Sequence, residues 1–396
     1  MSEMRKPPFP LPLIADGVSA AQMREAGMKK DDCPARWALG HPDFVRRQTE
    51  RYRKAGAGAV LAPTLAANRA ALEPLGLASR VRELNAGVLR LVAEGAGGLP
   101  VGGRIGPSGI AFSPEEADVF DDLFVLYREQ IRALDEAGAS FLLIERQISL
   151  ADMRAAMLAA RSTDLPVLVA MTPDRFEGRA ELLPSLITLQ AMGAAAMGVD
   201  NLPVEEAQEQ LRELLPHAEI PLVGRLSVPR AMSPEEYAAG AQALAAAGAR
   251  VFGAGQGASP AFTAALAAAA PSFAFPARRE ADSHAAASAE EVFFLGDDIE
   301  LSEPLVCSSR LDDDLIKLEH GPANVGLVRV ESLGDAMLLA EHGPLARLPL
   351  AVWADSQPVL EAALRYFQGR LLIDSSSPLD EEVLAATAEK YGAIVY

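Results

Sequence analysis

The stretch Phe141-Leu142-Leu143-Ile144-Glu145-Arg146 carries the clearest fold signal in the chain, because a short apolar run ends abruptly on charged residues. A run of this length, rich in Leu and Ile, is typical of a strand buried on both faces of a parallel sheet. Seven further runs share the pattern. They are residues 11–17, 59–64, 99–106, 166–172, 196–201, 221–226 and 250–255.

Segments of helical period, rich in Ala, Leu, Glu and Arg, separate these runs and indicate repeated βα units. Ser113-Pro114-Glu115-Glu116 and Ser233-Pro234-Glu235-Glu236 predict two of the helix starts. In both, Ser is expected to cap the helix, Pro to take its first position and Glu its first turn. Eight such units within residues 1–270 predict an α/β fold, a closed (β/α)8 TIM barrel.

A smaller α/β unit is expected after the barrel, at residues 291–396. Residues 271–290 are rich in Ala, Ser and Pro and are predicted to be a linker, with a continuation of the last barrel helix as the alternative for the first half. Such a unit is too short for a second full barrel, so its sheet is expected to gain cover from the first domain or from a partner. Its strands are expected at residues 292–296, 324–330, 348–354, 371–375 and 393–396.

Charge and cysteine content exclude several classes of protein. The 396 residues carry 54 acidic and 36 basic side chains, a net charge of −18 that argues against nucleic-acid binding. No run reaches about 18 uncharged apolar residues and the first residues lack a signal peptide's apolar stretch, so a cytoplasmic protein without membrane contact is expected. Only Cys33 and Cys307 are present, which argues against a disulfide scaffold.

Functional residues of such a barrel are expected at the carboxyl ends of its strands. Asp16 and Glu145 are predicted on opposite sides of this mouth, where they suit an ammonium group or a general acid/base pair. Carboxylates that only anchor loops or caps are the alternative. The other strand-end positions hold Thr64 with Asn68, Arg104, Thr172, Asp200 with Asn201, Arg225, and Gly255 with Gln256.

Seven strand-end segments also carry a family resemblance, in register along the barrel. They are IADG (14–17), APTLAANR (62–69), GRIGPSG (103–109), LLIE (142–145), PVLV (166–169), MGVDN (197–201) and GAGQGASP (253–260). With these segments the chain resembles the homocysteine S-methyltransferase family, whose barrel occurs in cobalamin-dependent methionine synthase and betaine-homocysteine methyltransferase.

The resemblance implies methyl transfer to homocysteine or a related amino-acid-like acceptor, within methionine biosynthesis or one-carbon metabolism. It implies that Asp16 and Glu145 hold the acceptor's amino group, and we expect Thr64 and Asn68 beside the same ligand. A catalytically silent ligand-binding or assembly subunit that retained the fold is the alternative.

The resemblance also implies a zinc ion held by three cysteines, which this chain replaces with Asn201, Gly255 and Gln256. None of these supplies a thiolate, so a degenerate zinc site is expected. A site made of Cys33, His41 and Asp200 is a weaker alternative.

The C-terminal unit resembles part of the pterin-binding domain of methionine synthase, through LPLAVWADS (348–356) and LIDS (372–375). That family's domain is a whole barrel, and this chain matches about half of it. Asp355 and Asp374 are the expected remnants of a pterin-like site. The methyl donor is therefore expected on a partner protein that binds a corrinoid or a pterin. The oligomeric state stays open, a homo-oligomer included.

Overall fold

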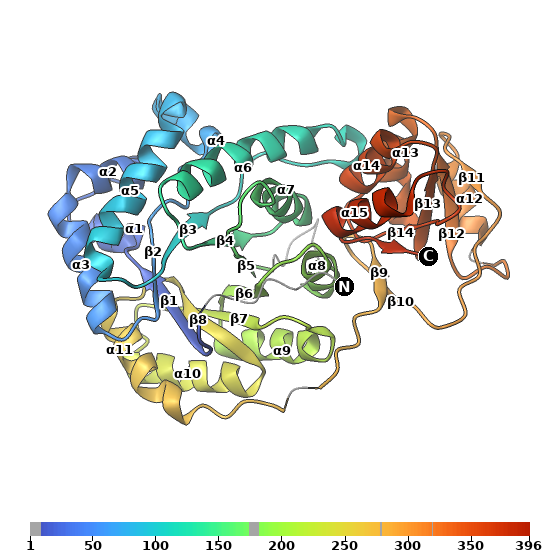
Figure 1. Cartoon of the computed structure of the whole chain (residues 1–396). Helices are drawn as coiled ribbons and strands as arrows, with labels where there is room; N and C mark the ends of the chain where they lie inside the picture. Colours follow the sequence, from blue (N-terminus) through green and yellow to red (C-terminus); the bar gives the residue numbers. More distant parts are fainter. Residues whose placement is uncertain (1–8, 174–181, 278, 319) are drawn as a thin grey trace.

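The computed structural model describes residues 9–173, 182–277, 279–318 and 320–396 (Figure 1). Eight parallel strands form a closed barrel in chain order, with β1 paired to both β2 and β8. The predicted TIM barrel is confirmed, because each predicted run overlaps one strand. The strands are β1 (Leu13–Gly17), β2 (Ala59–Leu61), β3 (Val101–Ile105), β4 (Phe141–Gln147), β5 (Val167–Met171), β6 (Ala196–Leu202), β7 (Leu222–Ser227) and β8 (Ala249–Gln256).

Helices surround the barrel, and both predicted helix starts begin a helical turn with Pro first and Glu in the first turn, but Ser caps only one of them with its side chain. Ser233 caps α10 in a capping box with Glu236. Ser113 precedes a 3₁₀ turn, and its hydroxyl donates to the Glu115 carboxylate at 3.1 Å and accepts no backbone N–H of the turn. The helices are α1 (Ala20–Glu25), α2 (Pro34–Gly40), α3 (Pro42–Lys54), α4 (Arg69–Leu72), α5 (Val81–Ala96), α6 (Val119–Glu136), α7 (Leu150–Ala160), α8 (Leu182–Ala191), α9 (Val204–Leu214), α10 (Pro234–Ala246) and α11 (Pro260–Ala269).

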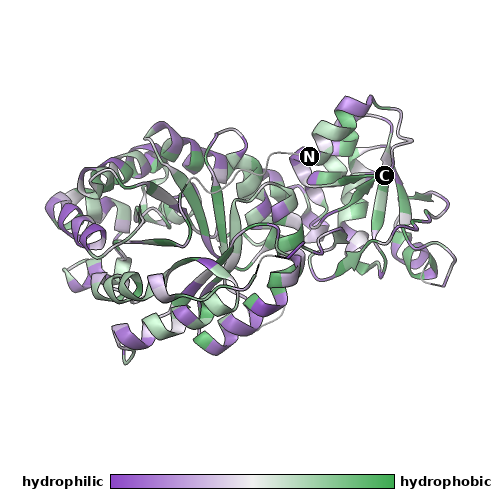
Figure 2. Ribbon diagram, turned by 60° about the horizontal axis from the view of Figure 1, so that its bottom comes forward, coloured by the Kyte–Doolittle hydropathy of each residue, from purple (hydrophilic) through white to green (hydrophobic). Residues whose placement is uncertain are grey.

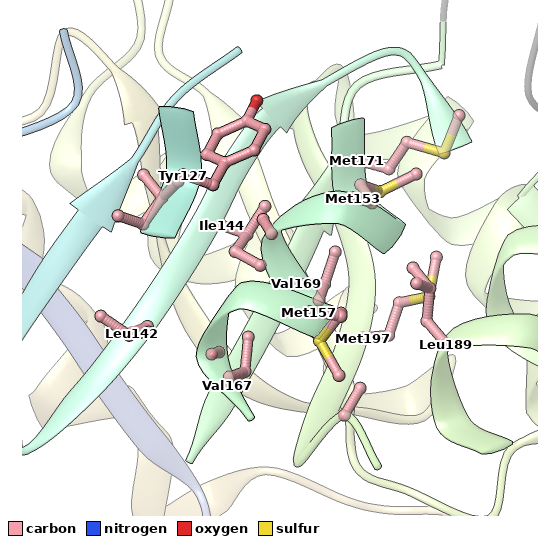
Figure 3. Close-up of a cluster of buried hydrophobic side chains, with 14 of the residues drawn as sticks. Tyr127, Leu142, Ile144, Met153, Met157, Val167, Val169, Met171, Leu189 and Met197 are labelled. Atoms are coloured by element: carbon pink, nitrogen blue, oxygen red, sulfur yellow. The ribbon is translucent and has the colours of Figure 1, made fainter. Parts of the chain in front are cut away.

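Strand side chains alternate between the lumen and the helix layer, and this decides where the polar strand ends point. On β4, Leu142 and Ile144 pack outward in the core shared with α6 and α7 (Figure 3). Phe141 and Leu143 pack inward in the apolar lumen core, where Phe9 meets Phe141 edge-on at 4.9 Å between ring centroids. Glu145 continues the inward series and therefore faces the lumen above this core.

The C-terminal unit is a five-stranded parallel sheet in chain order, with helices that follow its strands. Its strands are β11 (Leu305–Val306), β12 (Gly326–Val330), β13 (Leu350–Ala354), β14 (Leu372–Ile373) and β15 (Ile394–Val395). Its helices are α12 (Leu311–Leu318), α13 (Leu333–His342), α14 (Gln357–Tyr366) and α15 (Glu381–Tyr391). Figure 2 shows apolar residues concentrated on the strands of both units.

A strand lies within residues 292–296 as expected, but the start of this unit differs from the prediction in two respects. The strand expected at 292–296 is β10 (Val292–Phe294), which pairs antiparallel with β9 (Ala285–Ala287) outside the five-stranded sheet. β9 lies within the stretch expected as a linker, and its alanines are buried: Ala285 and Ala287 pack with Ile187 of α8, and Ala286 packs with the five-stranded sheet. Ala287 and Arg370 also exchange backbone hydrogen bonds. The first strand of the sheet is instead β11, whose two residues are too few to show a period.

Helices α6, α7 and α8 form the side of the barrel that meets the C-terminal unit (Figure 1). Arg154 of α7 is fully buried and donates to backbone carbonyls at the end of α14. Nearby, Arg365 of α14 pairs with Asp121 of α6 at 2.7 Å. Within the described ranges, no helix combines the length and apolarity needed to cross a bilayer.

Candidate functional site

Four charged side chains fill the lumen at the carboxyl ends of the strands, and we name them the lumen charge cluster. They are Arg104 from β3, Glu145 from β4, Asp200 from β6 and Arg225 from β7, all buried. Arg104 Nε donates to the Glu145 carboxylate, and Arg225 Nη2 lies 3.2 Å from Glu145 Oε2. Arg225 Nε donates to Asp200 Oδ1 at 3.2 Å. The cluster thus alternates positive and negative groups across the barrel.

Mutual pairing makes this burial tolerable, since an isolated buried charge would be costly. Burial raises the pKa of Asp200 to about 6 against the opposing charge of Arg225, and the neighbouring Glu145 raises it further. Burial disfavours the charged form of Arg225, but Glu145 and Asp200 outweigh this effect and raise its pKa. Arg225 also donates to the carbonyls of Ala15 at 3.2 Å and Ala254 at 2.5 Å.

Two glycines of β8 leave space for the Arg225 and Asn201 side chains. A methyl group at Gly253 would lie 2.5 Å from Arg225 Nη1, so this arginine fits only beside glycine. A methyl group at Gly255 would lie 2.7 Å from Asn201 Cβ. Asn201 has a left-handed backbone, φ 59°, at an irregularity in the β6 register. The side chain at 201 and the absence of one at 255 therefore depend on each other.

The described residues do not fit a zinc–thiolate site. Asn201 and Gly255 do lie together at the mouth, yet they offer an amide and no side chain, which are poor matches for zinc. Nothing is described of the Gln256 side chain. Among the residues that the structure describes, no three His, Cys, Asp or Glu side chains are placed to hold a metal.

The alternative site of Cys33, His41 and Asp200 is therefore wrong. Cys33 is buried at the start of α2, and in the described part of the chain it belongs to no group of three candidate metal ligands. His41 Nδ1 lies 2.8 Å from the Trp37 carbonyl, and its ring stacks on the Trp37 indole at 3.9 Å between centroids. Asp200 is engaged by the lumen charge cluster. His41 and Asp200 thus each have a structural partner.

Asp16 lies beside the cluster rather than in it. On β1 it shares the outward side with Ile14, and Thr263 of α11 donates to its Oδ2 at 3.3 Å. Burial raises the pKa of Asp16 to about 6, opposed first by the charge of Arg225. No hydrogen bond or ion pair joins Asp16 to Glu145 in the described part of the chain. Their shared hold on an amino group stays a prediction.

The Thr64 and Asn68 side chains hydrogen-bond to backbone groups at the mouth of the barrel. Thr64 Oγ1 bonds both the N–H and the carbonyl of Arg104 at 2.9 Å, so it holds the end of β3 in place. Asn68 caps α4 by accepting from the Ala71 N–H at 2.8 Å, and it donates to the Pro107 carbonyl at 3.3 Å. Their contact with a ligand likewise stays a prediction.

Asp355 and Asp374 follow neighbouring strands, β13 and β14, of the C-terminal sheet. Asp374 accepts from the Ser376 N–H at 2.9 Å and from its hydroxyl at 2.8 Å, while Asp355 is exposed. The carboxylates thus lie at one edge of the sheet, but one of them is already used in a turn. The pterin-like site stays a prediction.

Arg104 and Arg225 are the functional candidates for which the sequence predicted no role. Both stand at strand ends in the predicted barrel, where an arginine that faces the lumen must find carboxylates. That requirement is the signal that could have linked them to Glu145 and Asp200.

Comparison with known proteins gives a family match over the barrel. The family model described as homocysteine S-methyltransferase matches residues 13–270. The homocysteine methyltransferase MmuM from Escherichia coli is similar in its oxidised and metallated forms, each with 23% identity and a TM-score of 0.55, covering 65% of this chain and 95% of that chain. Its apo form gives 22% identity and a TM-score of 0.53 over the same shares. This likeness supports the fold. Among curated protein sequences, none matches this chain.

Proposed function

Since the chain belongs to the homocysteine S-methyltransferase family, we propose that its barrel binds homocysteine or a related amino-acid-like acceptor and serves methyl transfer to it without a zinc–thiolate site. The lumen charge cluster carries the proposal. It buries four charges at the end of the barrel where reacting groups lie, although apolar side chains would fill the lumen at lower cost.

Thiol methylation needs the thiolate, because the protonated thiol is a weak nucleophile. A sulfur–carbon bond forms, the bond between the methyl group and its donor breaks, and the thiol proton is released to water. Nearby guanidinium groups favour a thiolate, and Arg104 and Arg225 are the cations at this mouth. Their paired carboxylates reduce this effect, so we expect activity to rise with pH as the free thiol ionises.

We place the methyl donor on a separate corrinoid- or pterin-binding protein, in the cytoplasm. This follows from the C-terminal unit, where only Asp355 and Asp374 stand at predicted pterin positions and Asp374 already bonds Ser376.

A methyl-transfer assay tests the proposal. Homocysteine is supplied with methylcobalamin or methyl-tetrahydrofolate, each free and bound to a corrinoid- or pterin-binding carrier protein, or with a methyl sulfonium donor. Each reaction is run with and without a zinc chelator, alongside metal analysis of the purified protein. We expect chelator-resistant methionine formation, substoichiometric zinc and a large loss of rate in Glu145→Gln. Arg82→Gln, which removes an exposed partner of Glu136 on the outer helices α5 and α6, is the matched control. Stoichiometric zinc with chelator-sensitive turnover would refute the zinc-free route, and no turnover with any donor would refute methyl transfer.

One observation favours a second candidate, a ligand-binding or assembly protein without turnover. The charges of the lumen charge cluster balance one another inside the protein, which leaves no strong base for a substrate. Calorimetry decides between the two: binding of homocysteine or methionine without zinc and without methyl transfer supports this candidate, whereas turnover excludes it.

A further inference from the structure

Arg104 is held firmly yet uses only part of its hydrogen-bonding capacity. Thr64 fixes its backbone, and Nε donates to Glu145. The side chain is 10% exposed and faces the lumen, as Gly102 does two residues earlier beside Phe141. Within the described residues, no acceptor bonds Arg104 Nη1 or Nη2. At the barrel mouth the guanidinium thus presents four N–H groups that no described residue bonds.

This arrangement suits a carboxylate from outside the protein. A guanidinium can offer two parallel N–H groups to the two oxygens of a carboxylate, and burial strengthens such a bond. Glu145 cannot bond all the N–H groups of the Arg104 guanidinium, because Glu145 Oε2 is directed to Arg225 at 3.2 Å. Arg225 therefore holds Glu145 from one side and leaves the Nη edge of Arg104 for a ligand.

The remaining charges indicate which carboxylate compound fits. Asp200 Oδ2 is a buried acceptor without a hydrogen-bond donor among the described residues, and Glu145 Oε2 has the ion pair with Arg225 but no hydrogen bond. A ligand that carries an ammonium group beside its carboxylate can supply donors on this side and an acceptor for Arg104. A multiply charged anion such as a phosphate would instead meet two carboxylates.

We propose that Arg104 binds the α-carboxylate of a zwitterionic amino acid at the barrel mouth, an inference that rests on the proposed function. Arg104 is then a specificity-determining residue that separates an amino acid from its carboxamide. Loss of one charge-assisted bond predicts about tenfold to hundredfold weaker binding.

Calorimetry on the full chain tests this with three probes: L-methionine, L-methioninamide, which lacks the carboxylate, and 4-(methylthio)butanoate, which lacks the ammonium group. We expect the wild type to prefer methionine over its amide by at least about tenfold. Arg104→Gln should abolish this preference by weakening methionine alone, and Arg104→Lys should retain part of it. Arg82→Gln should change nothing.

A folding control keeps the result interpretable, because Arg104→Gln leaves Glu145 with one partner fewer. Thermal unfolding identifies folded variants, and the double variant Arg104→Gln/Glu145→Gln removes both charges together. If either folded variant still prefers methionine over its amide, or if the wild type has no such preference, the role of Arg104 is refuted while ligand binding stands. If the wild type binds none of the three probes, the proposed function fails first.

Discussion

Arg154→Ala should separate the stability of the C-terminal unit from that of the barrel. Arg154 donates to the carbonyl oxygens of Leu364 at 2.6 Å, Phe367 at 2.7 Å and Arg365 at 3.2 Å, and to Gln368 Oε1 at 3.0 Å. Truncation leaves these acceptors buried, and an unsatisfied buried acceptor costs about 1–3 kcal/mol. Part of this cost is offset, because the free energy spent on burying the Arg154 guanidinium is no longer needed. That burial is unfavourable, since it lowers the pKa of Arg154 to about 10. We expect a net loss of about 3–5 kcal/mol.

The two tryptophans of the chain provide the assay. Trp37 lies on α2 of the barrel and Trp353 on β13 of the C-terminal unit, so Trp37→Phe and Trp353→Phe each leave a reporter for one unit. Urea unfolding followed by fluorescence should give coincident transitions without the Arg154 change. With Arg154→Ala, the Trp353 transition should move to lower urea by more than the Trp37 transition.

Arg161→Ala is the matched control at the same joint. Arg161 is 36% exposed, and its guanidinium lies 3.7 Å from the Glu389 carboxylate, so its loss should cost less than about 1 kcal/mol. If Arg154→Ala moves the Trp353 midpoint no further than Arg161→Ala does, the buried arginine does not hold the units together.

Three further predictions concern the mouth of the barrel. The pKa of Asp16 is about 6 in the folded protein against a usual 3.8, so its protonation stabilises the fold fully below pH 3.8, and this stabilisation is lost above pH 6. Asp16→Asn does not lose it. In urea titrations the free energy of unfolding of Asp16→Asn, relative to wild type, should therefore be about 1.4 kcal/mol higher at pH 8 than at pH 5. Gly255→Ala should cost about 1–3 kcal/mol through its clash with Asn201 and recover partly with Asn201→Gly; an equal loss in both backgrounds contradicts this coupling. Glu145→Gln should destabilise the fold by about 3 kcal/mol, because two buried arginines lose a charged partner, and an unchanged melting temperature argues against the ion pairs.

Much of the fold was predictable because its signals are local. Apolar runs and helix-capping residues such as Ser233 act within a few residues, so the eight barrel strands follow from the sequence. The short strands were not predictable in this way. β9 pairs with the nearby β10 and is also fixed by a bridge between Ala287 and Arg370. β11 is a strand because Leu305 pairs with Val328. Arg370 and Val328 are distant in sequence from the residues they pair with, so neither contact leaves a local signal.

The candidate site likewise has features that the sequence determines and features that only the fold determines. The sequence by itself determined that Glu145, Asp200 and both arginines stand at strand ends, and that residues 201, 255 and 256 supply no thiolate. Only the tertiary structure decided that Glu145 is shared between Arg104 and Arg225 while Asp16 turns to Thr263. The reason is physical: a buried charge is tolerated only within a few ångströms of its counter-charge. Barrel closure brings together residues as distant in sequence as Glu145 and Arg225, which are 80 positions apart.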